Sequence, residues 1–284
     1  MQVWNIKTEM EISVKELCRC TNSFTQLFAS ERKQIAFMAD EKSPMRISHR
    51  PFATSRSEMR ISMKKINVAI DGPAGAGKST IAKLAAAKKQ FIYVDTGAMY
   101  RAMALACIRE NILADDEAGV VKVCENCDVT IEYENGEQKV LLNGENVNAF
   151  IRTEEVSQMT SAVSAYPQVR AKLLELQRNI AKTENVIMDG RDIGSNVLPD
   201  AEVKIYLTAS VHTRAKRRFI EQKEKGYTGT IEEIEAEIEK RDYRDSHREC
   251  APLTVAEGAV ILDSSDMTID EVVDKIIEYI DEAV

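Results

Sequence analysis

The feature that most constrains the fold is a glycine-rich segment between a short apolar run and an alanine-rich stretch. Residues 66–70 are largely apolar with β-branched side chains, which predicts a buried strand, and Lys78–Lys89 has the composition of a helix. The segment between them matches the pattern G-x-x-x-x-G-K-[ST]. Its residues are Gly72, Pro73, Ala74, Gly75, Ala76, Gly77, Lys78 and Ser79.

This spacing suits the binding of a polyphosphate. Glycines let the backbone wrap so that successive N–H groups point inward, at the positive end of the following helix. Lys78 would reach the β- and γ-phosphates of a nucleoside triphosphate, and the Ser79 hydroxyl is placed to ligate Mg²⁺. A plain glycine-rich turn before a helix is the alternative, but the strand before it and the helix after it favour a phosphate-binding loop (P-loop).

Strands and helices alternate along most of the remaining chain. Thr96 is a candidate N-cap for a helix that runs to about Asn111. The last helix has a clear period of 3.6 residues in its apolar positions. This alternation predicts an α/β fold with a parallel sheet covered on both faces. The further strands are expected at 91–94, 186–188, 203–207 and 260–262, and the last helix should place Ile269, Val272, Val273, Ile276, Ile277 and Ile280 on one face.

One segment interrupts the alternation of strands and helices. Residues 129–134 and 139–142 alternate between apolar and polar side chains, and Asn135-Gly136 lies between them. Asn-Gly between two alternating runs is a strong hairpin signal. The sequence therefore predicts a small antiparallel insert at about 129–147.

Two expected strands end in an acidic residue and lead into loops that carry arginine. Asp189 is followed by Gly190, Arg191 and Asp192, and Asp95 precedes Arg101 by six positions. Arginine beside aspartate at the carboxyl end of a strand suits the binding of a second, phosphorylated substrate. A structural ion pair is the competing interpretation for either motif alone.

A P-loop does not by itself distinguish a kinase from a nucleotide-dependent switch. The Asn-Lys-x-Asp motif that a guanine-specific GTPase would need is missing from the sequence. Residues 241–248 contain several arginines, and on a mobile helical flap these could surround a moving phosphoryl group and exclude water. A solvated helix face is the alternative for this segment. Arg214, Arg217 and Arg218 stand at helical spacing upstream and could belong to the same flap.

Composition excludes several other classes of protein. The net charge of −8, from 38 basic and 46 acidic side chains, does not favour binding to nucleic acid through the overall field. No apolar stretch approaches the roughly 20 residues that span a bilayer. The 6 cysteines are scattered as expected for reduced thiols in a cytoplasmic protein, and Cys124 and Cys127 are interpreted as free thiols at a helix end.

Residues 1–62 differ from the rest of the chain. The stretch 43–62 is rich in Ser, Arg and Met and has no helical or strand period. We expect residues 1–62 to be either a disordered extension or sequence upstream of a natural start at Met63, and we favour the second. The functional domain is therefore expected at 63–284.

Four motifs, in order along the chain, together resemble the bacterial cytidylate kinase family of nucleoside monophosphate kinases. They are the segments 71–78 (DGPAGAGK), 95–101 (DTGAMYR), 189–194 (DGRDIG) and 241–245 (RDYRD). The resemblance covers about 63–284. It implies a three-layer P-loop kinase with a five-stranded parallel sheet, a small antiparallel CMP-binding insert at about 124–157 and a helical lid at about 212–250.

The resemblance also implies roles for particular residues. Gly72 to Thr80 would hold the phosphates of ATP, with a serine where several related kinases have glycine after the lysine; Ser79 keeps a hydroxyl for Mg²⁺. Lys78, Arg191, Arg241 and Arg248 would act on the phosphates during transfer. The acceptor nucleotide would be held by Thr96 and Arg101, with Arg101 on its phosphate, by Ser161 and Arg170 at the cytosine ring, by Asp189 and Arg191, and by Asp192 and Asp245 at the sugar hydroxyls.

The implied reaction is ATP + (d)CMP → ADP + (d)CDP with Mg²⁺ as the cofactor. We expect a cytoplasmic monomer with ATP and CMP or dCMP as its partners, and neither a nucleic acid nor a membrane. A kinase for another small acceptor, such as UMP, AMP or shikimate, is the nearest alternative. A nucleotide-dependent switch that binds a partner protein and hydrolyses ATP slowly is the alternative from another class.

Overall fold

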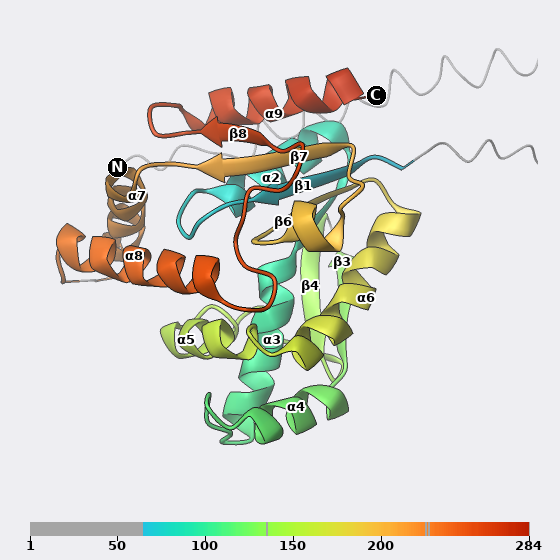
Figure 1. Ribbon diagram of the computed structural model, residues 1–284, viewed down its shortest axis with the longest axis vertical. Coiled ribbons are helices and arrows are strands. Elements are labelled where there is room, and N and C mark those ends of the chain that lie inside the picture. Colours follow the sequence, from blue (N-terminus) through green and yellow to red (C-terminus); the bar gives the residue numbers. More distant parts are fainter. Residues whose placement is uncertain (1–64, 135, 225, 227, 284) are drawn as a thin grey trace, which may run out of the picture. The chain divides into compact units, whose positions relative to one another are not determined.

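The computed structural model describes residues 65–134, 136–224, 226 and 228–283, so the expectation for residues 1–62 lies outside it. A five-stranded parallel sheet in the order β2-β6-β1-β7-β8 forms the centre of this part (Figure 1). The parallel sheet predicted from the sequence is confirmed. The strands are β1 (Asn67–Asp71), β2 (Ile92–Asp95), β6 (Val186–Gly190), β7 (Val203–Thr208) and β8 (Val260–Asp263).

Alternate side chains of the central strand β1 enter two separate cores. Val68 and Ile70 pack against α2 (Lys78–Lys89) and α9 (Ile269–Ala283) on one face of the sheet. Ala69 faces the opposite core, to which α3 (Thr96–Arg109) and α6 (Pro167–Thr183) contribute. The sheet is therefore the middle of three layers, as predicted.

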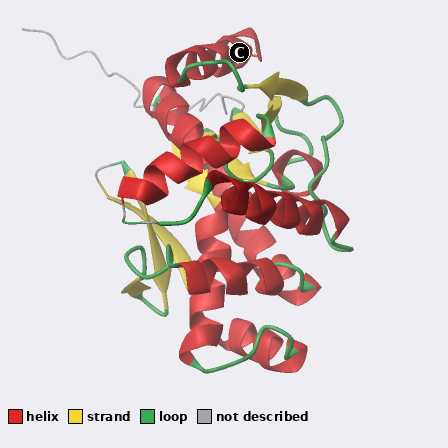
Figure 2. Ribbon diagram, turned by 90° about the vertical axis from the view of Figure 1, so that its left-hand side faces the viewer, coloured by secondary structure: helices red, strands yellow, loops and turns green. Residues whose placement is uncertain are grey.

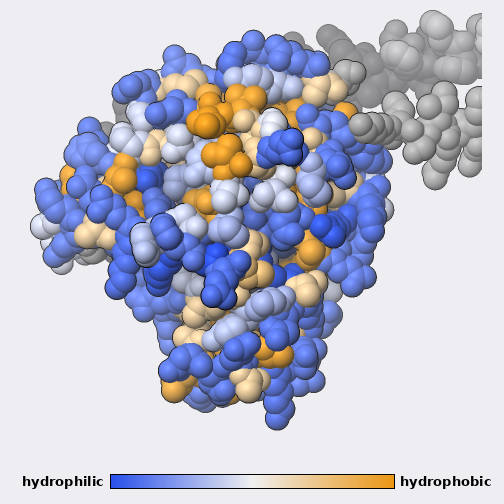
Figure 3. Space-filling view, viewed as in Figure 1, coloured by the Kyte–Doolittle hydropathy of each residue, from blue (hydrophilic) through white to orange (hydrophobic). Residues whose placement is uncertain are grey.

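The last helix follows its predicted pattern except at its first residue. Val272, Val273, Ile276 and Ile280 are buried, whereas Ile269 is 53% exposed. The first turn of α9 lines the cavity described below, so Ile269 faces that cavity instead of the core. Elsewhere the face shown in Figure 3 is largely hydrophilic, with apolar side chains gathered near β7 and β8.

The prediction that Thr96 caps α3 is wrong, because Asp95 is the N-cap. Asp95 has an extended backbone, and its Oδ1 accepts a hydrogen bond from the Ala98 amide at 2.9 Å. Thr96 is already helical, and its hydroxyl donates to the Asp189 carbonyl oxygen at 2.8 Å. The hydroxyl thus links the start of α3 to the end of β6.

The predicted hairpin is present as β3 (Val129–Glu134) and β4 (Glu137–Leu142), with β4 beginning two residues earlier than expected. A short third strand, β5 (Glu145–Asn146), completes this antiparallel sheet, and α4 (Glu117–Asn126) precedes it. Figure 2 shows the small sheet standing beside the helices, apart from the central sheet.

Side chains of the hairpin attach it to the edge strand β2. Gln138 of β4 accepts from the Asp95 amide at 2.8 Å and donates to the Asp95 carbonyl at 3.2 Å. Tyr133 of β3 donates to the carbonyl of Tyr93 at 3.1 Å. The insert is therefore anchored at the residue that also caps α3.

Two helices that carry most of the predicted flap lie against each other. They are α7 (Val211–Glu224) and α8 (Ile231–His247), with Ala215, Ile234 and Ile238 forming a small core between them. Thr230 and Glu233 form a capping box at the start of α8, which defines where this helix begins.

Cys107, Cys124, Cys127 and Cys250 are free thiols in the described part of the chain, and Cys127 lies at the C-terminal end of α4 as expected. Within that part, no cluster of His, Cys, Asp and Glu side chains is arranged to hold a metal ion. None of the described helices combines the length and the hydropathy needed to cross a bilayer.

Candidate active site

A cavity of about 780 Å³ lies at the carboxyl ends of the parallel strands. Both β1–β6 and β2–β6 pairing bring strand ends to the same edge, because Ile70 and Asp95 are each in register with Asp189. The predicted site residues that line this cavity are Ala74, Gly75, Ala76, Gly77, Lys78, Ser79, Thr80, Thr96, Arg101, Ser161, Arg170, Asp189, Arg191, Asp192, Arg241, Asp245 and Arg248.

Gly72 and Pro73 do not line the cavity, although both were expected to hold phosphates. Their carbonyl oxygens instead accept hydrogen bonds from the Lys78 ammonium group, each at 2.7 Å. A Cβ atom at Gly72 would lie 2.0 Å from the Leu207 carbonyl oxygen of β7, so only glycine fits against that strand. These two residues therefore shape the loop and orient the lysine.

The backbone of the loop leaves the start of α2 open toward the cavity. Gly77 adopts a left-handed conformation with φ of 84° and has no side-chain capping hydrogen bond. The first amide groups of α2 are consequently available to an anion at the positive end of the helix. Lys78 is buried, and this burial, with Arg191 nearby, lowers its pKa well below the ordinary value. An anion beside Lys78 would favour its charged form.

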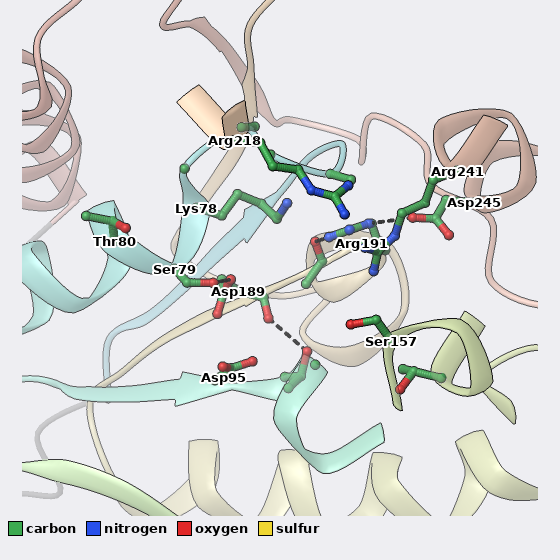
Figure 4. A pocket seen from close by; sticks show the side chains of 18 of the residues that line it. Lys78, Ser79, Thr80, Asp95, Ser157, Asp189, Arg191, Arg218, Arg241 and Asp245 are labelled. Atoms are coloured by element: carbon green, nitrogen blue, oxygen red, sulfur yellow. Dashed lines mark hydrogen bonds and ion pairs between the residues drawn. The ribbon is translucent and has the colours of Figure 1, made fainter. Parts of the chain in front are cut away.

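Asp189 joins the P-loop to the neighbouring strands. Its carboxylate accepts from the Ser79 hydroxyl at 2.8 Å (Figure 4). It also accepts from the Tyr93 hydroxyl at 3.0 Å. Burial and then the nearby Asp95 raise the pKa of Asp189 to about 6, while Lys78 and the two hydroxyl donors oppose the shift. The carboxylate therefore contacts the donor loop, although the family resemblance placed Asp189 with the acceptor nucleotide.

Two aspartates on the other side of the cavity are paired with arginines. Asp192 accepts from Arg170 and, at 3.4 Å, from Arg248. Asp245 accepts from Arg191 at 2.8 Å (Figure 4). The ion pairs considered as the alternative interpretation are thus present, and they lie inside the same cavity as the P-loop.

Two other arginines of the cavity have no such partner. Arg101 and Arg241 make no hydrogen bond or ion pair with any residue in 65–134, 136–224, 226 and 228–283. Burial, followed by the nearby Arg191, lowers the pKa of Arg241 to about 10, and its buried Nε has no hydrogen-bond partner. Cations that are buried in a cavity and make no hydrogen bond to a carboxylate favour an anionic ligand.

The family comparison decides between the remaining interpretations. The cytidylate kinase family model matches residues 68–282. This chain belongs to the cytidylate kinase family. A cytidylate kinase of Caldicellulosiruptor saccharolyticus is 53% identical over 216 residues, which are 76% of this chain and 96% of the relative. A cytidylate kinase of Lactobacillus johnsonii is 52% identical over 76% of this chain and 94% of its own.

A solved gluconokinase from Sinorhizobium meliloti 1021 is a more distant match, with 11% identity and a TM-score of 0.41 over 77% of this chain and 93% of its own. The family match covers 68–282, which lies within the domain expected at 63–284. It includes all four motifs from which the resemblance was inferred.

Several residues that line the cavity were not predicted from the sequence. Arg152 precedes α5 (Glu154–Val163) and belongs to none of the four motifs. Tyr100 lies within the second motif, and the Arg170 guanidinium is 5.4 Å from the centre of its ring. The start of α9 had been assigned only to the core. The other missed lining residues include Ser157, Ser264, Met267, Thr268, Ile269 and Val272, whereas Arg217 and Arg218, which were considered for the flap, also line the cavity.

Arg214 lies on α7 with Arg217 and Arg218, but it is buried and holds the P-loop instead of lining the cavity. Its guanidinium donates to the carbonyls of Ala209 and Ala74, at 2.9 and 2.8 Å, and to Asp242 at 2.6 Å. Asp242 also accepts from the Ala74 amide at 3.1 Å. Both polar groups of Ala74 are thus held by one ion pair between α7 and α8.

Proposed function

We propose that this protein transfers the γ-phosphoryl group of ATP to CMP or dCMP. One observation carries the proposal: a single cavity contains the P-loop on one side and an arginine-rich surface on the other. Phosphoryl transfer needs two substrates aligned in a common site and positive charge around the transferred group. Membership of the cytidylate kinase family supports a pyrimidine monophosphate as the acceptor.

The donor side would bind ATP through the P-loop. Lys78 and the amides at the start of α2 would hold the phosphates, with Thr80 beside them. Ser79 and Asp189 present hydroxyl and carboxylate oxygens 2.8 Å apart, a donor set that fits Mg²⁺. The ion would neutralise charge on the β- and γ-phosphates.

The acceptor side would bind CMP across the ends of β2 and β6. Arg101 would contact the phosphate, and Ser161 and Arg170 would contact the cytosine ring. Asp192 and Asp245 would accept from the sugar hydroxyls while remaining paired with their arginines, since each carboxylate has several lone pairs. Arginines already oriented by such pairs lose little freedom when the nucleotide binds.

Three arginines would stabilise the transferred group. Arg191 and Arg241 lie together near the end of the Lys78 side chain (Figure 4), and Arg248 reaches the same cavity from the end of α8. Positive groups held there in advance would act on charge as it develops. We also propose that the segment 212–250, which contains α7 and α8, acts as a lid that excludes water, and that 124–157 is the CMP-binding insert.

An acceptor panel tests the proposal. Purified protein with ATP and Mg²⁺ would be offered CMP, dCMP, UMP, AMP and shikimate, with ADP formation followed by a coupled assay. We expect kcat/KM for CMP or dCMP to exceed that for the others by at least about 100-fold, because groups that hydrogen-bond one base reject another strongly. A preference for UMP, AMP or shikimate would overturn the choice of acceptor. ADP formation that increases only when another protein is added would favour the alternative of a nucleotide-dependent switch.

We also propose that the functional unit is a monomer, because the P-loop and the predicted acceptor-binding residues already meet in one cavity without a residue from a second chain. Sedimentation velocity across the concentrations used in the kinetic assay would measure the oligomeric state. Specific activity that rises with the fraction of a dimer would contradict this part of the proposal.

A further inference from the structure

Arg152 is a cation of the cavity to which no role has yet been given. It lies between β5 and α5, in the segment that follows the small sheet, and it lines the cavity. Its Nη2 donates to Asp95 Oδ2 at 3.0 Å, and its side chain is 63% exposed. A guanidinium group carries five N–H donors, so this contact leaves most of them available.

Asp95 is held rigidly, and it can therefore orient Arg152. Its Oδ1 accepts from the Ala98 amide, and its backbone is bound on both sides by Gln138 of the insert. Oδ2 is left to receive Arg152. The arginine is thus attached to a fixed carboxylate at the start of α3, close to the residues expected to meet the acceptor.

A second cation, Arg101, lines the same cavity as Arg152. Burial lowers the pKa of Arg101, and the nearby Arg152 and Arg191 lower it further, whereas Asp95 and Asp189 oppose the shift. Arg101 and Arg152 are therefore close enough to repel each other. An anion between two guanidinium groups removes such repulsion and accepts hydrogen bonds from both.

The position of Arg152 identifies the anion. The ATP phosphates would lie at the start of α2, whereas Asp95, Arg101 and Arg152 lie around the start of α3 on the acceptor side. We propose that Arg152, oriented by Asp95, binds the phosphate of the acceptor nucleotide together with Arg101. This inference rests on the proposed function. It gives the insert at 124–157 a direct contact with the phosphate of the acceptor.

The test compares a nucleotide with its nucleoside. Dissociation constants of the R152M variant for CMP and for cytidine would be measured by ligand-observed NMR, which reaches millimolar affinities. We expect CMP binding to weaken about 10- to 100-fold, the loss expected for charged hydrogen bonds, while cytidine binding stays within about twofold. KM for ATP should also stay within about twofold. R152K should restore part of the CMP affinity because it restores the charge.

R109M is the matched control. Arg109 is also paired with a carboxylate, Glu145 at 2.6 Å, but it lies outside the cavity lining. The variant changes the net charge equally and should leave binding of CMP and cytidine unchanged. Equal weakening of CMP and cytidine by R152M, or no effect on either, would overturn the proposal.

A double-mutant cycle tests the role of Asp95 as a positioning residue. D95N should weaken CMP binding in the wild-type background and have little further effect in the R152M background, because the carboxylate acts through Arg152. Additive effects would show that Asp95 acts independently and would contradict the proposed orientation. If the acceptor panel selects a different nucleotide, the comparison of that nucleotide with its nucleoside still tests Arg152, so the two proposals fail separately.

Discussion

Replacing Asp242 by alanine should destabilise the domain and disorganise the P-loop at the same time. The substitution removes the carboxylate that accepts from Arg214 at 2.6 Å and from the Ala74 amide at 3.1 Å. Arg214 is only 4% exposed, so its charge would keep two carbonyl partners and lose its counter-ion. Breaking one partner of a buried pair costs about 3–5 kcal/mol, and the partial exposure of Asp242 favours the lower end, about 3 kcal/mol.

Differential scanning fluorimetry and urea unfolding measure this loss. For a domain of this size, about 3 kcal/mol corresponds to a decrease in Tm of about 6–12 °C. The matched control is E145A, which breaks the Arg109–Glu145 pair, whose side chains are 41% and 49% exposed. An exposed pair contributes about 0–1 kcal/mol, so E145A should change Tm little.

Kinetics of the same variant separate loop shaping from simple stabilisation. Because the lost pair holds both polar groups of Ala74, D242A should raise KM for ATP more than KM for CMP when assayed well below its Tm. A loss of stability no larger than that of E145A would refute the assigned burial cost. A large loss with an unchanged KM for ATP would refute the claim that the pair shapes the P-loop.

Two further substitutions test the site. K78A should lower kcat by about 100- to 1000-fold, the loss expected when one preorganised hydrogen-bond donor is removed, and should leave Tm nearly unchanged. Ordinary activity in K78A would show that the P-loop is misinterpreted. In D71N, the dependence of stability on pH should weaken between about pH 4 and 6. Burial raises the pKa of Asp71 from 3.8 to about 6 in the folded state, so its contribution to stability falls by about 3 kcal/mol as pH rises through this window. The pKa of Asp189 is raised as well, so part of the dependence of stability on pH should remain in D71N. Urea unfolding at several pH values measures the slope of the unfolding free energy against pH, and a slope equal to that of the wild type would contradict the assignment to Asp71.

Local sequence patterns were sufficient to predict most of the fold. The β-branched runs predicted the parallel strands because such strands are buried on both faces, and Asn135-Gly136 predicted the hairpin because few other turns suit that dipeptide. The P-loop was predictable because its function requires consecutive residues. In each case the determining interactions lie within a few positions of one another.

Pairings between distant residues could not be predicted in this way. Arg214 and Asp242 are 28 positions apart, and their ion pair exists because α7 and α8 pack together around Ala215. Arg152 reaches the cavity only because Gln138 anchors the insert beside Asp95. Nothing in the local pattern of either arginine distinguishes it from one on a solvated surface.

The pairing of charges within the cavity gives a physical criterion for assigning its arginines. Arg170, Arg191 and Arg248 have carboxylate partners, and such pairs hold guanidinium groups in place without a ligand's charge. Arg101 and Arg241 have no such partner in the described part of the chain, and their pKa values are lowered chiefly by burial. A bound phosphate would therefore offset more of the cost of burying the charge at Arg101 and Arg241 than at the three arginines that already have carboxylate partners. It follows that replacing Arg101 or Arg241 should weaken phosphate binding more than replacing Arg170, Arg191 or Arg248, whose replacement should mainly affect the orientation of the substrates and the rate of transfer.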